Sequence, residues 1–315
     1  ARHDDAPDVC AMGIELARKE GADLVVGTDP DADRVGIAVR RPDGEYELVT
    51  GNRIAALLIH YICEQLTACG RFPKNAVMLT TIVSGDLMKN IARSYGAEVV
   101  EVLTGFKWIA EKMEQYDRAG SPGRPSKQFI FGAEESYGYL PAAFVRDKDA
   151  VSSTAFIADV AALAAEQGIG LHGLLQSLFK RFGYYQEGAK NITMPGQQGA
   201  EAIKVLMSGL RANPPRTFAG RAVVTVGDIK SGEIKDPRTG RGVGRYDLPS
   251  SNVLVFILED GTKVIARPSG TEPKIKFYIL IREPADDLTT ARQRAAAKIE
   301  TINAELDALA GELGR

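Results

Sequence analysis

The sequence predicts an α/β protein with a mixed sheet, followed by a smaller C-terminal α+β domain. Over residues 45–170, short apolar runs alternate with segments of helical periodicity, which is typical of sheets covered by helices on both faces. Over residues 216–315, strand-like runs are followed by one long segment of helical periodicity, which is typical of an α+β domain. At 315 residues the chain is long enough for about two or three domains.

The first 43 residues hold too few elements to make a domain. Met12 and Leu16 recur at helical spacing, and apolar runs over 24–27 and 35–39 predict two strands joined by a loop. One helix and two strands cannot bury a core of their own. We therefore expect residues 1–43 to be the C-terminal part of an α/β domain whose beginning lies outside this sequence, which also starts without an initiator Met.

The rest of the chain is expected to form two further domains and a linker. Residues 44–185 carry the alternating pattern, with one helical face over 54–62 and a Gly-, Pro- and Ser-rich loop over 120–126. Residues 186–215 are expected to be a linker, and residues 216–315 the α+β domain. The other expected strands are 76–83, 99–102, 129–131, 222–226, 253–258, 263–267 and 276–281, with helices around 87–95, from 106, over 152–166 and from 288.

Charge and composition exclude several classes of function. The 39 Lys and Arg residues balance 41 Asp and Glu residues, so the chain has no global basic field to hold nucleic acid. No apolar run reaches the roughly 18 residues of a membrane span. Three Cys residues do not suffice for a disulfide framework, which favours a cytoplasmic protein. His60, Cys63 and Cys69 match no zinc spacing and are expected to pack in the core of a helix.

The strongest local signal is an acidic loop between two expected strands, residues 29–34, with the sequence Asp-Pro-Asp-Ala-Asp-Arg. Asp29, Asp31 and Asp33 repel one another unless a cation neutralises them, and hard carboxylate oxygens at this spacing suit Mg²⁺ or Ca²⁺. An EF-hand is excluded, because arginines stand where its Gly and Glu should be. A polar turn that uses Asp for capping is the alternative.

A second loop, the glutamate loop, spans residues 132–139 after an expected strand, where α/β sheets usually place their ligand sites. A carboxylate at Glu134 and a hydroxyl at Ser136 suit two neighbouring hydroxyls of a sugar. The loop lacks one Gly of a nucleophile elbow, and no His of the sequence stands in a context that suggests a catalytic partner. A solvated turn is the alternative.

A third loop, the arginine loop, spans residues 267–274 between two expected strands. Its Arg, its hydroxyls and a Gly that exposes backbone N–H groups could cradle a phosphate, and an ordinary hairpin connection is the alternative. Two further cationic segments stand out. Lys107 begins an expected helix beside the only Trp, and residues 145–149 alternate in charge close to the glutamate loop. Each is a candidate site or a solvated charge cluster.

Together, these five segments resemble the α-D-phosphohexomutase superfamily in order and spacing, over nearly the whole chain. The acidic loop is similar to the family's metal loop, and the glutamate loop to its Gly-Glu-Glu-Ser sugar loop, with Ala133 for Gly. The matching site residues are Asp29, Asp31, Asp33, Arg34, Lys107, Glu134, Ser136, Arg146, Lys148, Arg267, Ser269, Gly270 and Thr271. Within the family, the Glu-Glu-Ser run is most similar to bacterial phosphoglucomutases, whereas mannose/glucose-type enzymes tend to carry Glu-Met-Ser.

The resemblance implies mixed-sheet α/β domains of the phosphohexomutase type, followed by an α+β domain. It implies reversible transfer of phosphate between C1 and C6 of glucose, through a phosphoserine and glucose 1,6-bisphosphate. Asp29, Asp31 and Asp33 would hold Mg²⁺, with Arg34 beside the phosphoserine. The implied partners are hexose phosphates, with no nucleic acid and no membrane, and the resemblance sets no oligomeric state.

The resemblance also implies roles for the other loops. Glu134 and Ser136 would bind sugar hydroxyls, and Arg146 would belong to the same substrate-binding set. The arginine loop would anchor the phosphate that does not react. Lys107 and Lys148 would contact phosphate or assist acid–base chemistry, and the second role needs a lowered pKa.

The sequence departs from the family at its N-terminal end. The family has four domains, and its first carries the reactive Ser in a Thr-Ala-Ser-His-Asn-Pro-like loop that does not occur in these 315 residues. The resemblance therefore implies an N-terminally truncated mutase with part of domain 2 followed by domains 3 and 4, and we expect the chain alone to be inactive. A phosphomannomutase, a phosphopentomutase and a non-catalytic sugar-phosphate-binding fragment stay open as alternatives.

Overall fold

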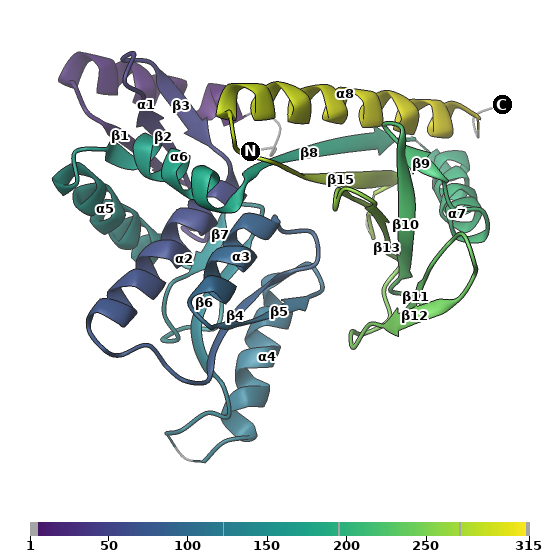
Figure 1. Cartoon of the computed structure of the whole chain (residues 1–315), viewed down its shortest axis with the longest axis horizontal. Coiled ribbons are helices and arrows are strands. Elements are labelled where there is room, and N and C mark those ends of the chain that lie inside the picture. Colours follow the sequence, from purple (N-terminus) through teal and green to yellow (C-terminus); the bar gives the residue numbers. More distant parts are fainter. Residues whose placement is uncertain (1–5, 122, 195, 271, 313–315) are drawn as a thin grey trace. The chain divides into compact units, whose positions relative to one another are not determined.

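The chain divides into two compact units, residues 1–182 and residues 183–315. Their helices and strands are coloured along the chain in Figure 1. Among the residues described, the first unit holds two sheets and the second holds one connected sheet. The computed structural model describes residues 6–121, 123–194, 196–270 and 272–312.

The first sheet of the first unit has three antiparallel strands in the order β1-β2-β3. Helix α1 (Ala6–Glu20) precedes β1 (Leu24–Thr28), and the acidic loop joins β1 to β2 (Val35–Arg40). A turn joins β2 to β3 (Tyr46–Val49). The expected helix, strand, loop and strand of this region are confirmed. Strand β2 is the central strand, and its apolar residues are buried.

The second sheet of the first unit has four strands in the order β5-β4-β6-β7. Strand β4 (Ala76–Thr81) is buried along its whole length and runs parallel to β5 (Glu98–Val102) and β6 (Gln128–Glu134). The short β7 (Gly138–Leu140) returns antiparallel to β6. Because the carboxyl ends of parallel strands meet at one edge, the residues that follow β4 and β6 lie close together there.

Five helices among the described residues complete the first unit: α2 (Gly51–Ala68), α3 (Asp86–Ser94), α4 (Phe106–Arg118), α5 (Ala150–Glu166) and α6 (Gly170–Phe182). The Asp149 side chain caps α5 by accepting hydrogen bonds from two backbone N–H groups of its first turn. No single helix of the described segments is long and apolar enough to cross a membrane. Helices α5 and α6, bent by 85°, pass that test only as a pair and by length and composition alone.

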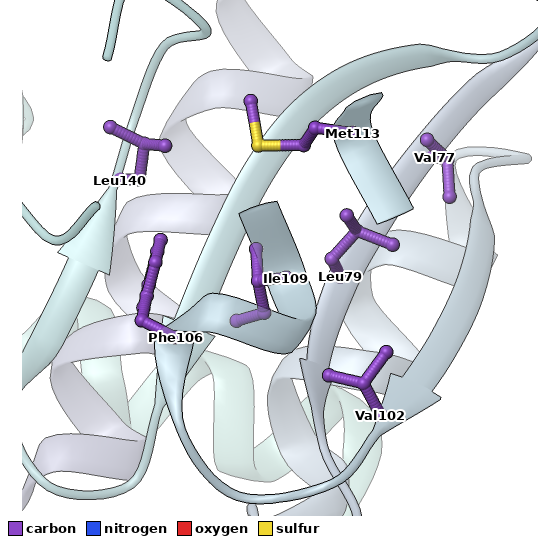
Figure 2. Close-up of a cluster of buried hydrophobic side chains, with 7 residues drawn as sticks. All are labelled: Val77, Leu79, Val102, Phe106, Ile109, Met113 and Leu140. Atoms are coloured by element: carbon purple, nitrogen blue, oxygen red, sulfur yellow. The ribbon is translucent and has the colours of Figure 1, made fainter. Parts of the chain in front are cut away.

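A compact apolar cluster fixes α4 on the second sheet (Figure 2). Side chains from α4 meet those of β4, β5 and β7, and each is buried. The members of this cluster are Val77, Leu79, Val102, Phe106, Ile109, Met113 and Leu140. Since burial of each such side chain contributes about 1.5–3 kcal/mol, the cluster holds the N-terminus of α4 firmly beside the end of β6.

The second unit is built on one antiparallel sheet, whose main path runs β12-β11-β10-β13-β14-β15-β8, with β9 paired to β10. Helix α7 (Gly196–Ala212) and the long α8 (Leu288–Glu312) accompany it, and α8 lies along β8 and β15 (Figure 1). The strands are β8 (Tyr184–Thr193), β9 (Thr217–Phe218), β10 (Arg221–Asp228), β11 (Glu233–Lys235), β12 (Gly242–Arg245), β13 (Leu254–Leu258), β14 (Lys263–Pro268) and β15 (Lys274–Glu283).

The expected linker over residues 186–215 is wrong. Strand β8 pairs with β15 along its full length, and α7 follows it, so these residues belong to the sheet unit. The run 186–190, Gln-Glu-Gly-Ala-Lys, holds residues with low strand propensity. Pairing with the apolar β15 makes it a strand, and this tertiary influence is invisible in the local sequence. The division of residues 1–182 into separate domains stays a prediction.

Candidate functional site

The acidic loop holds its three carboxylates together at the start of β2. One oxygen each from Asp29, Asp31 and Asp33 lies within 4.8 Å of the others. Asp29 Oδ1 accepts hydrogen bonds from the backbone N–H groups of Asp33 at 3.1 Å and Arg34 at 2.9 Å. Burial opposes the ionisation of Asp29, but these hydrogen bonds outweigh it and hold the pKa of Asp29 below its ordinary value. The loop is therefore shaped around a charged carboxylate.

The donor set of this loop fits a divalent metal ion. Asp33 Oδ1 is buried and has no hydrogen-bond partner among the described residues. Its nearby cation is Arg34, whose Nε lies 3.5 Å away, and Asp31 stands exposed beside them. A buried carboxylate oxygen without a donor is costly unless a cation meets it. Hard carboxylate oxygens are the ligands that Mg²⁺ prefers, so the three Asp residues are suited to hold it.

Glu134 ends β6 and is only 8 % exposed. Its Oε1 accepts a hydrogen bond of 2.8 Å from the backbone N–H of Gly105, which caps the start of α4. Gly105 has φ +111°, a conformation that favours glycine. Burial raises the pKa of Glu134, the Gly105 N–H partly offsets this, and the charge of Glu135 raises it further. The site therefore holds a desolvated carboxyl group in a fixed direction.

Backbone hydrogen bonds tie the region of the acidic loop to the glutamate loop and to the first residue of α5. Val35 N–H donates to the carbonyl of Tyr137 at 3.1 Å, and Ala150 N–H donates to the carbonyl of Ala32 at 3.0 Å. Both acceptors are non-glycine residues with positive φ, 67° for Tyr137 and 56° for Ala32. Residues persist in this costly conformation only where the surroundings fix it. The first residue of β2 thus holds Tyr137 in place, and the first residue of α5 holds Ala32.

Lys148 pairs with a carboxylate of the acidic loop and packs its aliphatic stem on the glutamate loop. Its Nζ lies 2.9 Å from Asp33 Oδ2 and 2.9 Å from Asp147 Oδ1, and its side chain is 12 % exposed. Its aliphatic stem crosses Gly138, where an added Cβ would stand 2.2 Å from Lys148 Cδ. Burial opposes the ammonium charge, but the two carboxylates outweigh it and raise the pKa of Lys148. This direction suits charge stabilisation and is opposite to what an acid–base lysine needs.

The arginine loop connects β14 and β15 in the second unit. Ser269 N–H donates to the carbonyl of Lys274 at 2.7 Å, and Glu272 N–H donates to Ser269 Oγ at 3.3 Å. Arg267 stands directly opposite Lys276 across the two strands and donates to the hydroxyl of Tyr278 at 3.3 Å. Like charges in register repel unless an anion lies near them. Gly270 is exposed, and Thr271 lies outside the described residues.

Comparisons with known proteins bear on this arrangement. Residues 50–182 match the family described as phosphoglucomutase/phosphomannomutase, alpha/beta/alpha domain III. The phosphoglucomutase of Staphylococcus aureus strain MRSA252 is 37 % identical over 280 residues, which is 88 % of this chain and 48 % of that protein. That of Staphylococcus epidermidis strain RP62A is 37 % identical over 268 residues, 85 % of this chain and 47 % of that protein.

These matches place residues 50–182 in the phosphoglucomutase/phosphomannomutase domain III family and show that the chain is similar to phosphoglucomutases over 88 % of its length. The resemblance seen in its loops is thereby confirmed. The chain spans about half the length of the curated relatives it matches.

Solved phosphohexomutases share the fold at low sequence identity. The parafusin phosphoglucomutase of Paramecium, in its open form, gives a TM-score of 0.63 at 18 % identity and covers 97 % of this chain and 50 % of its own. A Thermus thermophilus protein described as a phosphomannomutase gives 0.58 at 16 %, covering 96 % and 49 %. The N-acetylphosphoglucosamine mutase of Aspergillus fumigatus, solved with GlcNAc-6P and magnesium, gives 0.52 at 12 %, covering 96 % and 53 %. These likenesses show that the chain has the mixed α/β fold of these solved proteins.

Arg146 and Lys107, two of the predicted site residues, do not contact the carboxylates around Lys148. Arg146 turns to α4, where its Nη2 lies 2.6 Å from Asp117 Oδ2, beside a cavity of about 230 Å³. Lys107 is exposed, with its Nζ 5.1 Å from the centre of the Trp108 ring. Ser136 is half-buried on the glutamate loop. The predicted roles of all three stay predictions.

Sequence reasoning missed several contributors to the site. The backbone N–H of Gly105 lies beside Lys107, and the carboxylate of Asp147 lies beside Lys148. The sequence marks the two lysines as candidates but neither of these neighbouring groups. The predicted site residues also do not include Thr81, at the carboxyl end of β4, or Gly51, at the start of α2. Thr81 follows from the rule that ligand sites gather at the carboxyl ends of parallel strands. No local signal marks Gly51, because its importance comes from a contact made in the fold.

Proposed function

We propose that this chain is the metal- and sugar-binding part of a phosphoglucomutase-type phosphohexomutase, which interconverts glucose 1-phosphate and glucose 6-phosphate. One observation carries the proposal. The ammonium of Lys148, in the segment that follows the glutamate loop, pairs with Asp33 of the acidic loop. In the glutamate loop itself, Glu134 accepts a hydrogen bond from the backbone N–H of Gly105. The carboxylates proposed to bind metal and the carboxylate proposed to bind sugar thus belong to the same unit. The homology to phosphoglucomutases gives the reaction class.

Asp29, Asp31 and Asp33 would hold Mg²⁺ in this proposal. When bound, the ion supplies positive charge that neutralises a phosphoryl group in transfer. Arg34 and Lys148 add fixed positive charge at the same place, and the raised pKa of Lys148 keeps its ammonium charged. A bound magnesium in the Aspergillus fumigatus relative supports the choice of metal.

Glu134 and Ser136 would accept and share hydrogen bonds with neighbouring sugar hydroxyls. Burial makes such bonds strong, because water does not compete for the Glu134 carboxylate. The arginine loop would hold the phosphate group that does not react, with Arg267 offering its planar fork and Ser269, Gly270 and Thr271 offering hydroxyl and backbone donors. The GlcNAc-6P bound to the Aspergillus relative supports a hexose phosphate as ligand.

The phosphoryl donor of the proposed reaction is a serine in a Ser-His-Asn-Pro-like segment, and these 315 residues contain no such segment. Glucose 1,6-bisphosphate is the intermediate that the donor would form and consume. We therefore propose that this chain binds hexose phosphates and Mg²⁺ but does not turn them over by itself. Its residues bind, orient and neutralise charge.

A coupled assay and a binding titration test this proposal. The purified chain is given glucose 1-phosphate, Mg²⁺ and a trace of 1,6-bisphosphate, and formation of glucose 6-phosphate should not exceed background. Calorimetric titration with glucose 1-phosphate in the presence of Mg²⁺ should show binding that Glu134→Ala removes. Turnover would contradict the proposal that the phosphoryl donor is a serine that these 315 residues do not contain. Absence of binding would overturn the assignment of the site. Parallel titrations with mannose 1-phosphate and ribose 1-phosphate would rank the alternative substrates.

A further inference from the structure

We propose that Glu135 is a positioning residue, which anchors the glutamate loop from inside the fold so that Glu134 and Ser136 face the sugar. The inference rests on the proposed function and deepens it. Glu135 is the middle residue of the Glu-Glu-Ser run, and its carboxylate contacts the protein interior rather than the side on which Glu134 meets Gly105.

The side chain of Glu135 is held at the carboxyl end of β4. Its Oε2 accepts a hydrogen bond of 3.3 Å from Thr81 Oγ1. The Thr81 hydroxyl in turn lies 2.8 Å from Ser84 Oγ, and both of these residues are fully buried. A charge-assisted hydrogen bond in a buried hydroxyl network is stronger than one in water. Thr81 and Ser84 thus form a buried hydrogen-bonded pair that holds this carboxylate.

The backbone of Glu135 is held from a second direction, by the first residue of α2. A Cβ added to Gly51 would stand 2.1 Å from the carbonyl oxygen of Glu135 and 3.0 Å from the nitrogen of Tyr137. The Tyr139 hydroxyl, fully buried, donates to the carbonyl of Gly51 at 3.0 Å. Helix α2 and the glutamate loop therefore touch backbone to backbone. No side chain at residue 51 fits this approach.

The two neighbouring carboxylates are directed to different partners, Glu134 to Gly105 N–H and Glu135 to Thr81. Their charges repel, since Glu135 contributes to the raised pKa of Glu134. The strained Tyr137, with φ 67°, lies two residues after Glu135, and its conformation needs the loop to be fixed on both sides.

This anchor matters for sugar recognition because two hydroxyls on adjacent carbons demand acceptors at fixed separation and direction. A displacement of about 1 Å at such a contact weakens binding by an order of magnitude or more. Glu135 therefore acts on affinity through the loop conformation and makes no contact with sugar. An inorganic phosphate, which has no sugar hydroxyls, should not sense the anchor.

The test compares Glu135→Gln, Glu135→Ala and Thr81→Val with the unchanged chain, and Glu166→Ala serves as a matched control at an exposed helical Glu. Two quantities are measured calorimetrically with Mg²⁺ present, the Kd for glucose 1-phosphate and the Kd for inorganic phosphate. We expect Glu135→Ala and Thr81→Val each to weaken glucose 1-phosphate binding by about tenfold or more and to leave phosphate binding within about twofold. Glu135→Gln keeps an acceptor oxygen for Thr81 and should stay within about threefold.

The double variant Glu135→Ala with Thr81→Val separates anchoring from direct contact. If the two residues act as one unit, the double variant should be no worse than either single one, because their energies are coupled. Loss of binding in Glu135→Ala with none in Thr81→Val would mean that Glu135 touches the sugar, and would overturn the inference. Unchanged binding in both single variants would overturn it as well.

A second measurement keeps the inference distinct from the proposed function. Hydrogen exchange of the ligand-free chain should show the amides of residues 134–139 exchanging at least about tenfold faster in Glu135→Ala and Thr81→Val than in the unchanged chain or Glu166→Ala. Unchanged exchange would refute the anchor even if sugar binding were found. A chain that bound no glucose 1-phosphate but showed faster exchange would refute the proposed function and the positioning role in recognition, and leave only the structural contact.

Discussion

Lys148 Nζ lies 2.9 Å from Asp33 Oδ2, so a residue of the segment after the glutamate loop provides a counter-charge for the acidic loop. The remaining oxygen of Asp33, Oδ1, is buried without a hydrogen-bond partner among the described residues. The two oxygens of one carboxylate thus have separate tasks. One oxygen holds Lys148, and the other lies 3.5 Å from Arg34 Nε, where it is suited to meet a metal cation.

Replacing Lys148 by Met should tighten Mg²⁺ binding. The ammonium repels an incoming cation at the carboxylate it contacts, and its loss should raise Mg²⁺ affinity by about three- to thirtyfold. Calorimetric titration of the variant with MgCl₂ measures this. Lys107→Met is the matched control, because Lys107 is exposed and stacks on Trp108. An affinity that is equal or lower in Lys148→Met would mean that Lys148 mainly orients Asp33.

Gly51→Ala should destabilise the first unit by about 3 kcal/mol or more, since its Cβ would stand 2.1 Å from the carbonyl oxygen of Glu135 and backbone atoms cannot yield cheaply. Gly27→Ala is the control, because no atom lies within 4 Å of the position its Cβ would take. Urea unfolding followed through the fluorescence of Trp108, the only Trp, reports on the first unit. Equal midpoints for the two variants would show that α2 does not pack on the glutamate loop in this way.

Ala32→Gly should stabilise the metal-free chain. Ala32 has φ 56°, a backbone conformation that costs an L-residue about 1–2 kcal/mol and that Gly adopts without this cost. Part of the gain in folding free energy is lost, because Gly has more conformational freedom in the unfolded state. The expected net gain is about 0.5–1 kcal/mol in the same unfolding measurement. Ala38→Gly, in the buried strand β2, should instead destabilise. A loss of stability in Ala32→Gly would indicate that residue 32 does not adopt this conformation.

Glu134→Gln should raise stability at neutral pH and abolish glucose 1-phosphate binding. Burial raises the pKa of Glu134 above its ordinary value of 4.5. A carboxyl group with a raised folded-state pKa favours folding below the unfolded pKa and loses this contribution as pH rises through the folded-state pKa. The variant should therefore match the unchanged chain near about pH 4 and exceed it near about pH 7.5. Urea midpoints at both pH values measure this, and equal midpoints at the higher pH would argue against a desolvated carboxylate.

Much of the fold and part of the site were predictable from local patterns. The apolar run of β4 and the helical face of α2 mark buried elements because burial imposes their period. The acidic loop was predictable because three carboxylates at alternate positions require neutralisation, and the structure brings Asp29, Asp31 and Asp33 within reach of one ion.

Contacts between distant segments were beyond local reasoning. The strand β8 exists because β15 pairs with it, although its own residues have low strand propensity. The ion pair between Arg146 and Asp117 depends on where α4 lies. The packing of the Lys148 side chain on Gly138 depends on a residue ten positions away in the sequence. Such features follow from packing, which no single segment of sequence encodes.

Titration with Mg²⁺ of the unchanged chain and of Asp31→Asn tests the central claim most directly. Asp31 is exposed, so the substitution alters the donor set and leaves the Asp29 hydrogen bonds to the loop intact. We predict one Mg²⁺ per chain for the unchanged protein, at least about tenfold weaker binding in Asp31→Asn, and an unfolding midpoint of Asp31→Asn that is no lower without metal. No Mg²⁺ binding by the unchanged chain, or equal binding by both, would contradict the assignment of the acidic loop as the metal site.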